Sequence, residues 1–316
     1  MNYVLRRAVS AVATLFAVST LLFLLLHIVP GDPAEILLSG GGMAPSQESV
    51  EALRSQLGLD RPLWQQYVTY MGNILQGDLG NSFQDGAPIA QEIVKRLPRT
   101  LELILTAALL AVVIGMPSGL LAALRRGGFW DGLFSSVSSF GLSIPVFVTG
   151  TLLILLFSQI LRLVPAGGFV SFTEDPVQHL IYLLMPAFSI AVSLTPVVFR
   201  MVRTSILEFL EKEWVRTARA KGLGERSVLV RHVVRNSLSP VVTVLGLHLG
   251  TLLGGTVLVE YVFNWPGLSG MLVQAVEQRD YPAVQGIVLV ICILFVLINL
   301  CVDLLYGLLD PRVRYN

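Results

Sequence analysis

Residues that carry out chemistry in enzymes are sparse in this chain of 316 residues, and they fall into no common catalytic spacing. A phosphate-binding loop requires glycines followed by a lysine and a Ser or Thr, because its backbone N–H groups and the lysine surround the phosphates. None of the three lysines, Lys95, Lys212 and Lys221, follows a glycine. The chain is therefore not expected to hydrolyse ATP or to be an enzyme, and no catalytic residue is predicted.

Metal-binding patterns are also missing from the sequence. The histidines stand far apart and without ligand spacing, at His27, His179, His232 and His248. The two cysteines, Cys292 and Cys301, both lie in the last apolar segment, where burial in a helix accounts for them. No disulfide, no metal site and no cofactor in this chain is predicted.

The composition indicates an integral membrane protein. Hydrophobic residues make up 54% of the chain and charged residues only 14%, which lies outside the range of ordinary soluble domains. Membrane lipid is thus an expected partner, and nucleic acid is not. The net charge of +1 is uninformative, because the distribution of charge between the two sides of a membrane matters more than its sum.

Six apolar segments are long enough to cross a bilayer as helices. The first is an uncharged run of 22 residues, about 33 Å as a helix, which is longer than the core of a cleaved signal peptide, the competing interpretation. The predicted spans are Ala8 to Val29, Leu103 to Leu124, Phe134 to Leu161, His179 to Phe199, Ser237 to Val259 and Tyr281 to Leu309.

Basic residues set the predicted orientation. With both termini in the cytoplasm, the inner segments hold 15 of the 22 Arg and Lys residues, as the positive-inside rule requires. The expected domains are 1–99, the first span plus a large outer loop with amphipathic helices starting at Ser46 and after Pro62, and 100–316, a five-helix core. The second of these outer helices is expected on the bilayer surface or against the spans. Within the core, residues 200–236 form the only long inner loop.

The stretch from Glu213 to Pro240 is the most distinctive part of that region. Good helix formers from Trp214 to Lys221 are followed by Gly222 and Gly224, which suit a helix end. Ser227 is predicted to cap a second helix before Pro240 opens the next span. The charge of the loop alone supports two interpretations equally, a solvated basic connector and a docking surface for a partner.

A few polar residues of the spans are candidates for a translocation path. His248 lies near the middle of the fifth span and shares a face with Thr251, and Glu260 lies at its outer end. The alternatives are a hydrogen bond between helices for the first two and ordinary solvation for the glutamate. Prolines inside the third and fourth spans, at Pro145, Pro186 and Pro196, are expected to kink them.

Several stretches resemble one family. RTARAKGLG from Arg216 to Gly224, followed by RHVVRNSLSPVVT to Thr243, is similar to the cytoplasmic coupling loop of bacterial ABC-importer permeases of the dipeptide, oligopeptide and nickel class. LGLDRPLWQQY, GDLGNSF, EYVFNWPGLSG and VDLLYGLLDPRVRY extend the likeness over essentially the whole chain. The broader family has Glu-Ala-Ala, three residues, then Gly. Here the acid is replaced by Arg216 and a downstream proline by Arg235, and both departures resemble the peptide branch.

The resemblance implies an all-α permease of the type I ABC importer fold, with six transmembrane helices and cytoplasmic termini, in the bacterial inner membrane. It implies several partners: a second homologous permease subunit in a homodimer or heterodimer, two cytosolic ATP-binding subunits that use ATP and Mg, and an extracytoplasmic solute-binding protein. The implied substrates are dipeptides, longer peptides, glutathione-like peptides or nickel chelates. The implied ATPase-coupling residues are Arg216, Thr217, Ala218, Arg219, Ala220, Lys221 and Gly222.

An ion-coupled secondary transporter is the alternative function. Such a protein normally carries ionisable groups within the membrane. The predicted spans contain His248 and almost nothing else that titrates, which favours the importer.

Overall fold

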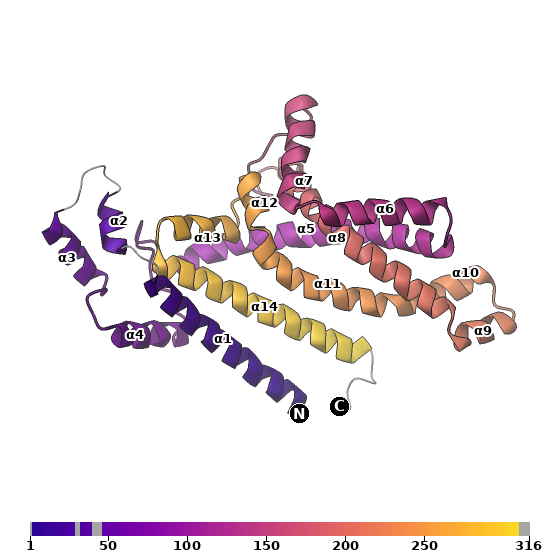
Figure 1. Ribbon diagram of the computed structural model, residues 1–316, viewed down its shortest axis with the longest axis horizontal. Helices are drawn as coiled ribbons and strands as arrows, with labels where there is room; N and C mark the ends of the chain where they lie inside the picture. The colour runs from indigo at the N-terminus through magenta and orange to yellow at the C-terminus, as the bar shows by residue number, and fades with distance from the viewer. Residues whose placement is uncertain (1, 29–31, 40–45, 310–316) are drawn as a thin grey trace. The chain divides into compact units, whose positions relative to one another are not determined.

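The computed structural model describes residues 2–28, 32–39 and 46–309, which form helices joined by loops (Figure 1). Within these ranges there is no β-strand, only one isolated bridge between Asn81 and Pro88. The α-helices are α1 (Asn2–Ile28), α2 (Pro33–Ser39), α3 (Gln47–Gln56), α4 (Leu63–Leu75), α5 (Ile89–Leu124), α6 (Phe129–Ser143), α7 (Val146–Leu153), α8 (Pro176–Leu210), α9 (Glu213–Ala220), α10 (Glu225–Ser227), α11 (Arg235–Gly255), α12 (Val257–Val262), α13 (Leu268–Glu277) and α14 (Tyr281–Leu309). Two π-helices, η1 (Ile154–Ile160) and η2 (Val228–Val234), continue α7 and α10.

Four helices of the described chain are long and apolar enough to cross a membrane: Val9–Ile28 within α1, α5, α8, and Tyr281–Cys301 within α14. The pair formed by α6 and α7 with η1 brings the number to five if it is one span. The expected all-α, multi-span architecture is therefore confirmed. The predicted span from Ser237 to Val259 is divided between α11 and α12 and is not among these helices, so the count of six and the position of the termini stay predictions.

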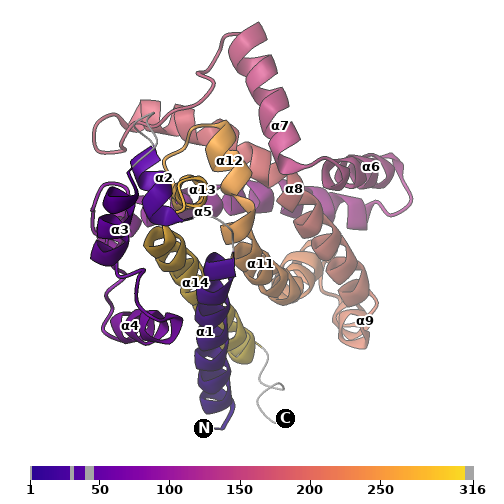
Figure 2. The ribbon, with the colours of Figure 1, turned by 60° about the vertical axis from the view of Figure 1, so that its left-hand side comes forward.

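The span predicted from Phe134 to Leu161 is broken at Pro145, where the chain bends by 101° between α6 and α7, so the segment is either a broken span or a re-entrant loop. Proline disfavours a helical conformation in the residue before it, and Ile144 accordingly has extended backbone angles, φ −92° and ψ 124°. A new helix starts directly after Pro145. Figures 1 and 2 both show α7 turning away from α6. By contrast, α8 runs through Pro186 and Pro196 without interruption.

The two amphipathic helices predicted in the first 99 residues are present as α3 and α4. The Oγ of Ser46 accepts a hydrogen bond from the N–H of Ser49 at 3.3 Å, which caps α3. α4 begins after Pro62 and leaves Trp64, Val68 and Leu75 exposed along one side. An exposed apolar side of this kind suits contact with lipid.

The helices group into two compact units, which are described separately. One consists of Met1–Arg99 and Gly267–Val296, and the other of Thr100–Pro266 and Leu297–Asn316. In the first unit, Phe23 of α1 packs its ring 5.3 Å from Tyr67 and 5.7 Å from Tyr70, both on α4. The hydroxyl groups of Thr20 and Tyr67 are 2.8 Å apart. These contacts fix α4 against the second half of α1.

In the second unit, α8 is the central helix and packs against α6, α7, α11 and α12. Glycines allow close approach on two of its sides. A Cβ atom at Gly119 of α5 would lie 2.8 Å from the carbonyl oxygen of Phe199. At Gly141 of α6, a Cβ atom would lie 3.1 Å from the carbonyl oxygen of Val192. The N–H group that would normally donate to this oxygen within the helix is absent, because the residue four positions later is Pro196.

Candidate functional site

The predicted coupling loop is a short helical hairpin that follows α8 directly (Figure 1). Lys212 has extended backbone angles, φ −69° and ψ 142°, and this breaks α8 from α9. The carboxylate of Glu213 then receives a hydrogen bond from Nη1 of Arg216 at 2.9 Å, and the Oγ1 of Thr217 donates to the carbonyl of Glu213 at 3.0 Å. An acidic residue in the first turn also suits the positive end of the helix dipole. The predicted helix is thus confirmed, shifted by one residue.

Gly222 ends α9 in the left-handed conformation, with φ +79°. Its N–H donates to the carbonyl of Arg219 at 2.9 Å, and the N–H of Leu223 donates to that of Ala218 at 3.3 Å. These two bonds form a Schellman motif, the helix end for which glycine is favoured. The predicted glycine corner is therefore present.

The second half of the hairpin differs from the expectation. α10 begins at Glu225 with Gly224 in the capping position, and Ser227 makes no capping hydrogen bond. From there α10, η2 and α11 follow one another without a gap, and Pro240 lies inside α11. The predictions that Ser227 caps a helix and that Pro240 opens a new segment are therefore wrong. The π-helix η2 joins the hairpin directly to α11, so no capped helix end lies between them.

A bidentate ion pair closes the corner. Nε of Arg219 lies 2.7 Å from Oε1 of Glu225, and Nη2 lies 3.2 Å from Oε2. Both side chains are exposed, so the pair contributes little to the free energy of unfolding. Its geometry nevertheless joins the end of α9 to the start of α10, on either side of Gly222.

The hairpin is anchored on one side and open on the other. Val215 and Ala218 of α9 are buried together with Val228 and Val233 of η2, in a core cluster that includes Ile206 of α8. Ala218 therefore serves packing and does not contribute to the exposed surface. The remaining predicted coupling residues are exposed: Arg216, Thr217, Arg219, Ala220, Lys221 and Gly222. A displacement of this surface would be carried by the buried contacts to α8 and α11.

The residues predicted for the translocation path have three different environments. The His248 side chain is half-buried, and exposed Thr251 donates its Oγ1 hydrogen to the carbonyl of His248 at 2.8 Å. Glu260 is 1% exposed and accepts a hydrogen bond from Oγ1 of Thr100 at 2.7 Å. The alternative prediction, that Glu260 is simply solvated, is therefore wrong. A path role for the three residues stays a prediction.

A buried histidine cluster in the second unit has no counterpart among the sequence motifs. His179 of α8 is 2% exposed, with Nε2 2.8 Å from Oε1 of Glu102 and Nδ1 2.7 Å from the carbonyl of Val170. The rings of Phe169 and Trp265 meet its ring edge to face, at 5.7 and 5.9 Å. Since Glu102 and His179 are 77 residues apart, no local motif could have predicted the pair.

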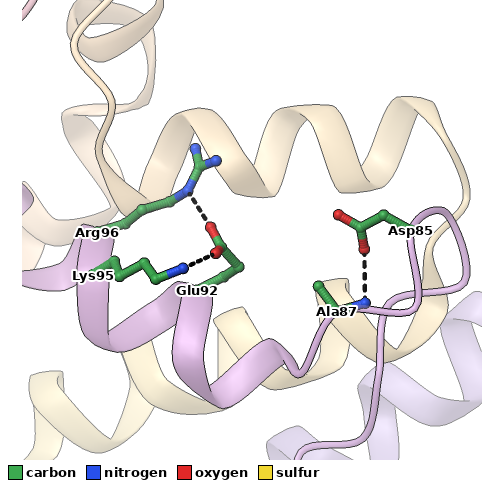
Figure 3. A network of polar contacts seen from close by, with 5 residues as sticks. All are labelled: Asp85, Ala87, Glu92, Lys95 and Arg96. Carbon is green, nitrogen blue, oxygen red and sulfur yellow. Dashed lines mark hydrogen bonds and ion pairs between the residues drawn. The ribbon is translucent and has the colours of Figure 1, made fainter.

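Polar contacts also organise the start of α5 in the first unit (Figure 3). Glu92 lies between Nζ of Lys95 at 2.8 Å and Nε of Arg96 at 3.4 Å. In the preceding loop, the N–H of Ala87 donates to Asp85 at 3.0 Å, which lowers the pKa of that carboxyl group. No group of three or more His, Cys, Asp or Glu side chains arranged to hold a metal occurs in the described ranges.

Two families match the chain, and together they cover almost all of it. Residues 115–315 match the family described as "Binding-protein-dependent transport system inner membrane component". Residues 1–104 match its companion, "Binding-prot-dependent transport system membrane comp, N-term". The first match alone covers more than half of the sequence, including the α9–Gly222 hairpin.

Curated relatives match from end to end. The chain is 42% identical to the "Glutathione transport system permease protein GsiC" of Escherichia coli strain K12, over 316 residues and 100% of both chains. The protein of the same name from Shigella flexneri serotype 5b is also 42% identical over the full length of both.

The fold matches that of a solved importer. A chain from "Inward facing conformations of the MetNI methionine ABC transporter" superposes with a TM-score of 0.57 at 20% identity, covering 71% of this chain and 98% of that one. At this identity the likeness concerns the fold alone. With the family and relatives above, it leads to one conclusion: the chain belongs to the binding-protein-dependent inner-membrane component family, as a multi-pass permease subunit of an ABC importer.

Proposed function

We propose that this permease subunit imports a peptide or similar small solute and is driven through the α9–Gly222 hairpin by two cytosolic ATP-binding subunits that hydrolyse ATP with Mg. A solute-binding protein delivers the substrate, and a second homologous permease subunit completes the path. The substrate class is supported by full-length relatives named as glutathione permeases. Family membership favours this function over the ion-coupled alternative.

The observation that carries the coupling role is the two-sided construction of the hairpin. One side is fixed to the core through Val215 and Ala218, and the other presents Arg216, Thr217 and Lys221 to solvent. A docking element must be both accessible to its partner and rigidly attached to the parts that it moves. The buried side chains and the Schellman motif give the hairpin a defined shape, which suits a docking element better than a fully solvated connector.

Photocrosslinking tests the docking. A photoreactive amino acid in place of Thr217 should form a covalent adduct with an ATP-binding subunit in membranes that contain the whole transporter. The same amino acid in place of Lys95, an exposed residue of α5, serves as the control and should not. If the Thr217 position gave no such adduct, or if both positions gave it equally, the hairpin would not be the docking site.

A further inference from the structure

The segment that joins the α9–Gly222 hairpin to α11 is the π-helix η2. It continues α10 without a gap, leads directly into α11, and also contacts α8 and α9. Backbone hydrogen bonds in a π-helix join residues five apart, and such turns are rare and frequently lie at functional sites. Any motion of the hairpin that reaches α11 along the chain passes through η2.

The burial pattern of η2 depends on its π winding. Val228 and Val233 are both 0% exposed, whereas Val230 between them is 59% exposed. The two buried valines belong to the cluster that holds Val215 of α9 and Ile206 of α8. Residues five apart lie one turn apart on the same face of a π-helix, but in an α-helix they point about 140° away from each other. With α winding from Val228 onward, Val233 would therefore turn out of the core.

The other π-helix, η1, does not share this pattern. None of its residues, Ile154–Ile160, is buried, so its winding brings no buried pair together. In η2 the same winding places two side chains in one core cluster. The π winding of η2 is thus tied to a specific contact.

The same residues also allow an α-helical winding of η2. Leu229 follows Val228, is half-buried and packs against the same cluster. Leu229 and Val233 are four residues apart, the spacing that places two side chains on one face of an α-helix. In α winding, Leu229 would replace Val228 as the partner of Val233. One apolar side chain is exchanged for another, so the two windings bury a similar apolar area.

Aromatic contacts join η2 to the hairpin sideways. The ring of Trp214 on α9 lies 6.4 Å from the ring of His232 on η2 and 6.2 Å from that of Phe209 on α8. A displacement of α9 would therefore act on η2 directly, and not only through the corner at Gly222.

We propose that η2 is a register joint, which changes from π to α winding when the ATP-binding subunits displace the hairpin. Leu229 then replaces Val228 opposite Val233, and the hairpin shifts by one residue relative to α11, about 1.5 Å of helix rise. The force that drives this change rests on the proposed function. The joint itself rests on the winding and burial of η2.

Deletion of Val230 tests the joint, because it removes the one residue that α winding does not need. Val228 and Val233 are then four residues apart, so an α-helix buries both and the variant is locked in that winding. Uptake of labelled trialanine per ATP hydrolysed, in the complete transporter, should fall by about tenfold or more, because the second register is no longer populated. Val230→Ala is the matched control. It keeps the number of residues and should couple as the parent does.

Spin labels at Arg226 and Arg235, exposed residues on either side of η2, measure the winding directly. The turns of an α-helix hold fewer residues than those of a π-helix, so α winding makes the same segment longer. In the complete transporter, the distance between the labels should therefore increase when ATP is bound and its hydrolysis is blocked. After deletion of Val230, the distance should be the same with and without ATP.

Two results would overturn the joint: normal coupling after deletion of Val230, or a label distance that ATP does not change in the transporter with an intact η2. Thermal unfolding shows whether the deletion variant keeps its core, and if it does not, the label distances decide. Photocrosslinking from Thr217 separates the joint from the proposed function. If the adduct forms but deletion of Val230 leaves coupling normal, only the joint is wrong. If no adduct forms, the proposed docking is wrong.

Discussion

The guanidinium group of Arg203 holds the carboxylate of Asp131 by two hydrogen bonds, 2.7 Å from Nε to Oδ1 and 2.8 Å from Nη2 to Oδ2. Oδ2 also accepts from the N–H of Gly127 at 2.9 Å. The pair thereby joins the turn between α5 and α6 to α8, the helix that leads into α9. The pair is therefore a bidentate connection between the helix that leads into the α9–Gly222 hairpin and the rest of the second unit.

Replacing Arg203 with Gln should lower the free energy of unfolding by about 1–3 kcal/mol, because the buried Asp131 carboxylate loses its bidentate partner. Chemical unfolding in detergent measures this loss. The charge-exchanged double variant, Asp131→Arg with Arg203→Asp, should recover part of it. If Arg203→Gln had the same free energy of unfolding as the parent, the pair between Arg203 and Asp131 would not contribute to stability.

The close approach of α5 to α8 predicts a strong effect of one methyl group. Gly119→Ala should destabilise the protein by about 1–3 kcal/mol, because the new Cβ would meet the carbonyl of Phe199 at 2.8 Å. Gly132→Ala is the matched control: this glycine of α6 has open space around it, so the change should be neutral or slightly stabilising. Equal melting temperatures for the two variants would argue against the packing described.

The pair between Arg219 and Glu225 should matter for coupling more than for stability. Glu225→Gln is expected to change the free energy of unfolding by less than about 1 kcal/mol, since both side chains are exposed. The same variant should reduce the uptake obtained per ATP hydrolysed, because the corner loses its bridge. Lys212→Gln, which breaks the exposed pair between Lys212 and Glu208 and leaves the bridge, is the comparison variant. A loss of stability with unchanged coupling would reverse this interpretation.

Local chemistry explains what the sequence could predict. The end of α9 depends on Gly222, the cap of α3 on Ser46, and the break before α7 on Pro145, and each effect acts over a few residues. The spans follow from uncharged runs of sufficient length. Pro145 was expected to kink its span, but the size of the bend depends on the helices packed around it.

Long-range packing explains what could not be predicted. Glu260 looked solvated because its neighbours in sequence say nothing of Thr100, 160 residues away, which binds it. The same is true of the contact between His179 and Glu102. The sequence predicts a coupling role for Ala218 because it lies in a contiguous run of seven such residues, whereas its burial depends on Val228 and Val233 on the returning arm of the hairpin.

The most direct test of coupling through the hairpin compares two glycines in the same corner. Gly222 has φ +79° and Gly224 has φ −64°, and a Cβ atom added at either glycine would meet no other atom within 4 Å. Valine at Gly222 must adopt the left-handed conformation at a cost of about 1–2 kcal/mol, or else rebuild the corner. Valine at Gly224 meets no such penalty.

The measurement is uptake of labelled trialanine per ATP hydrolysed, in the complete transporter with its binding protein. Gly222→Val should lower this ratio by about 5- to 30-fold, as expected when 1–2 kcal/mol opposes the docking conformation, while membrane insertion stays intact. Gly224→Val should stay close to the parent. Normal coupling in Gly222→Val, or an equal loss in both variants, would contradict the assignment of this corner as the coupling site.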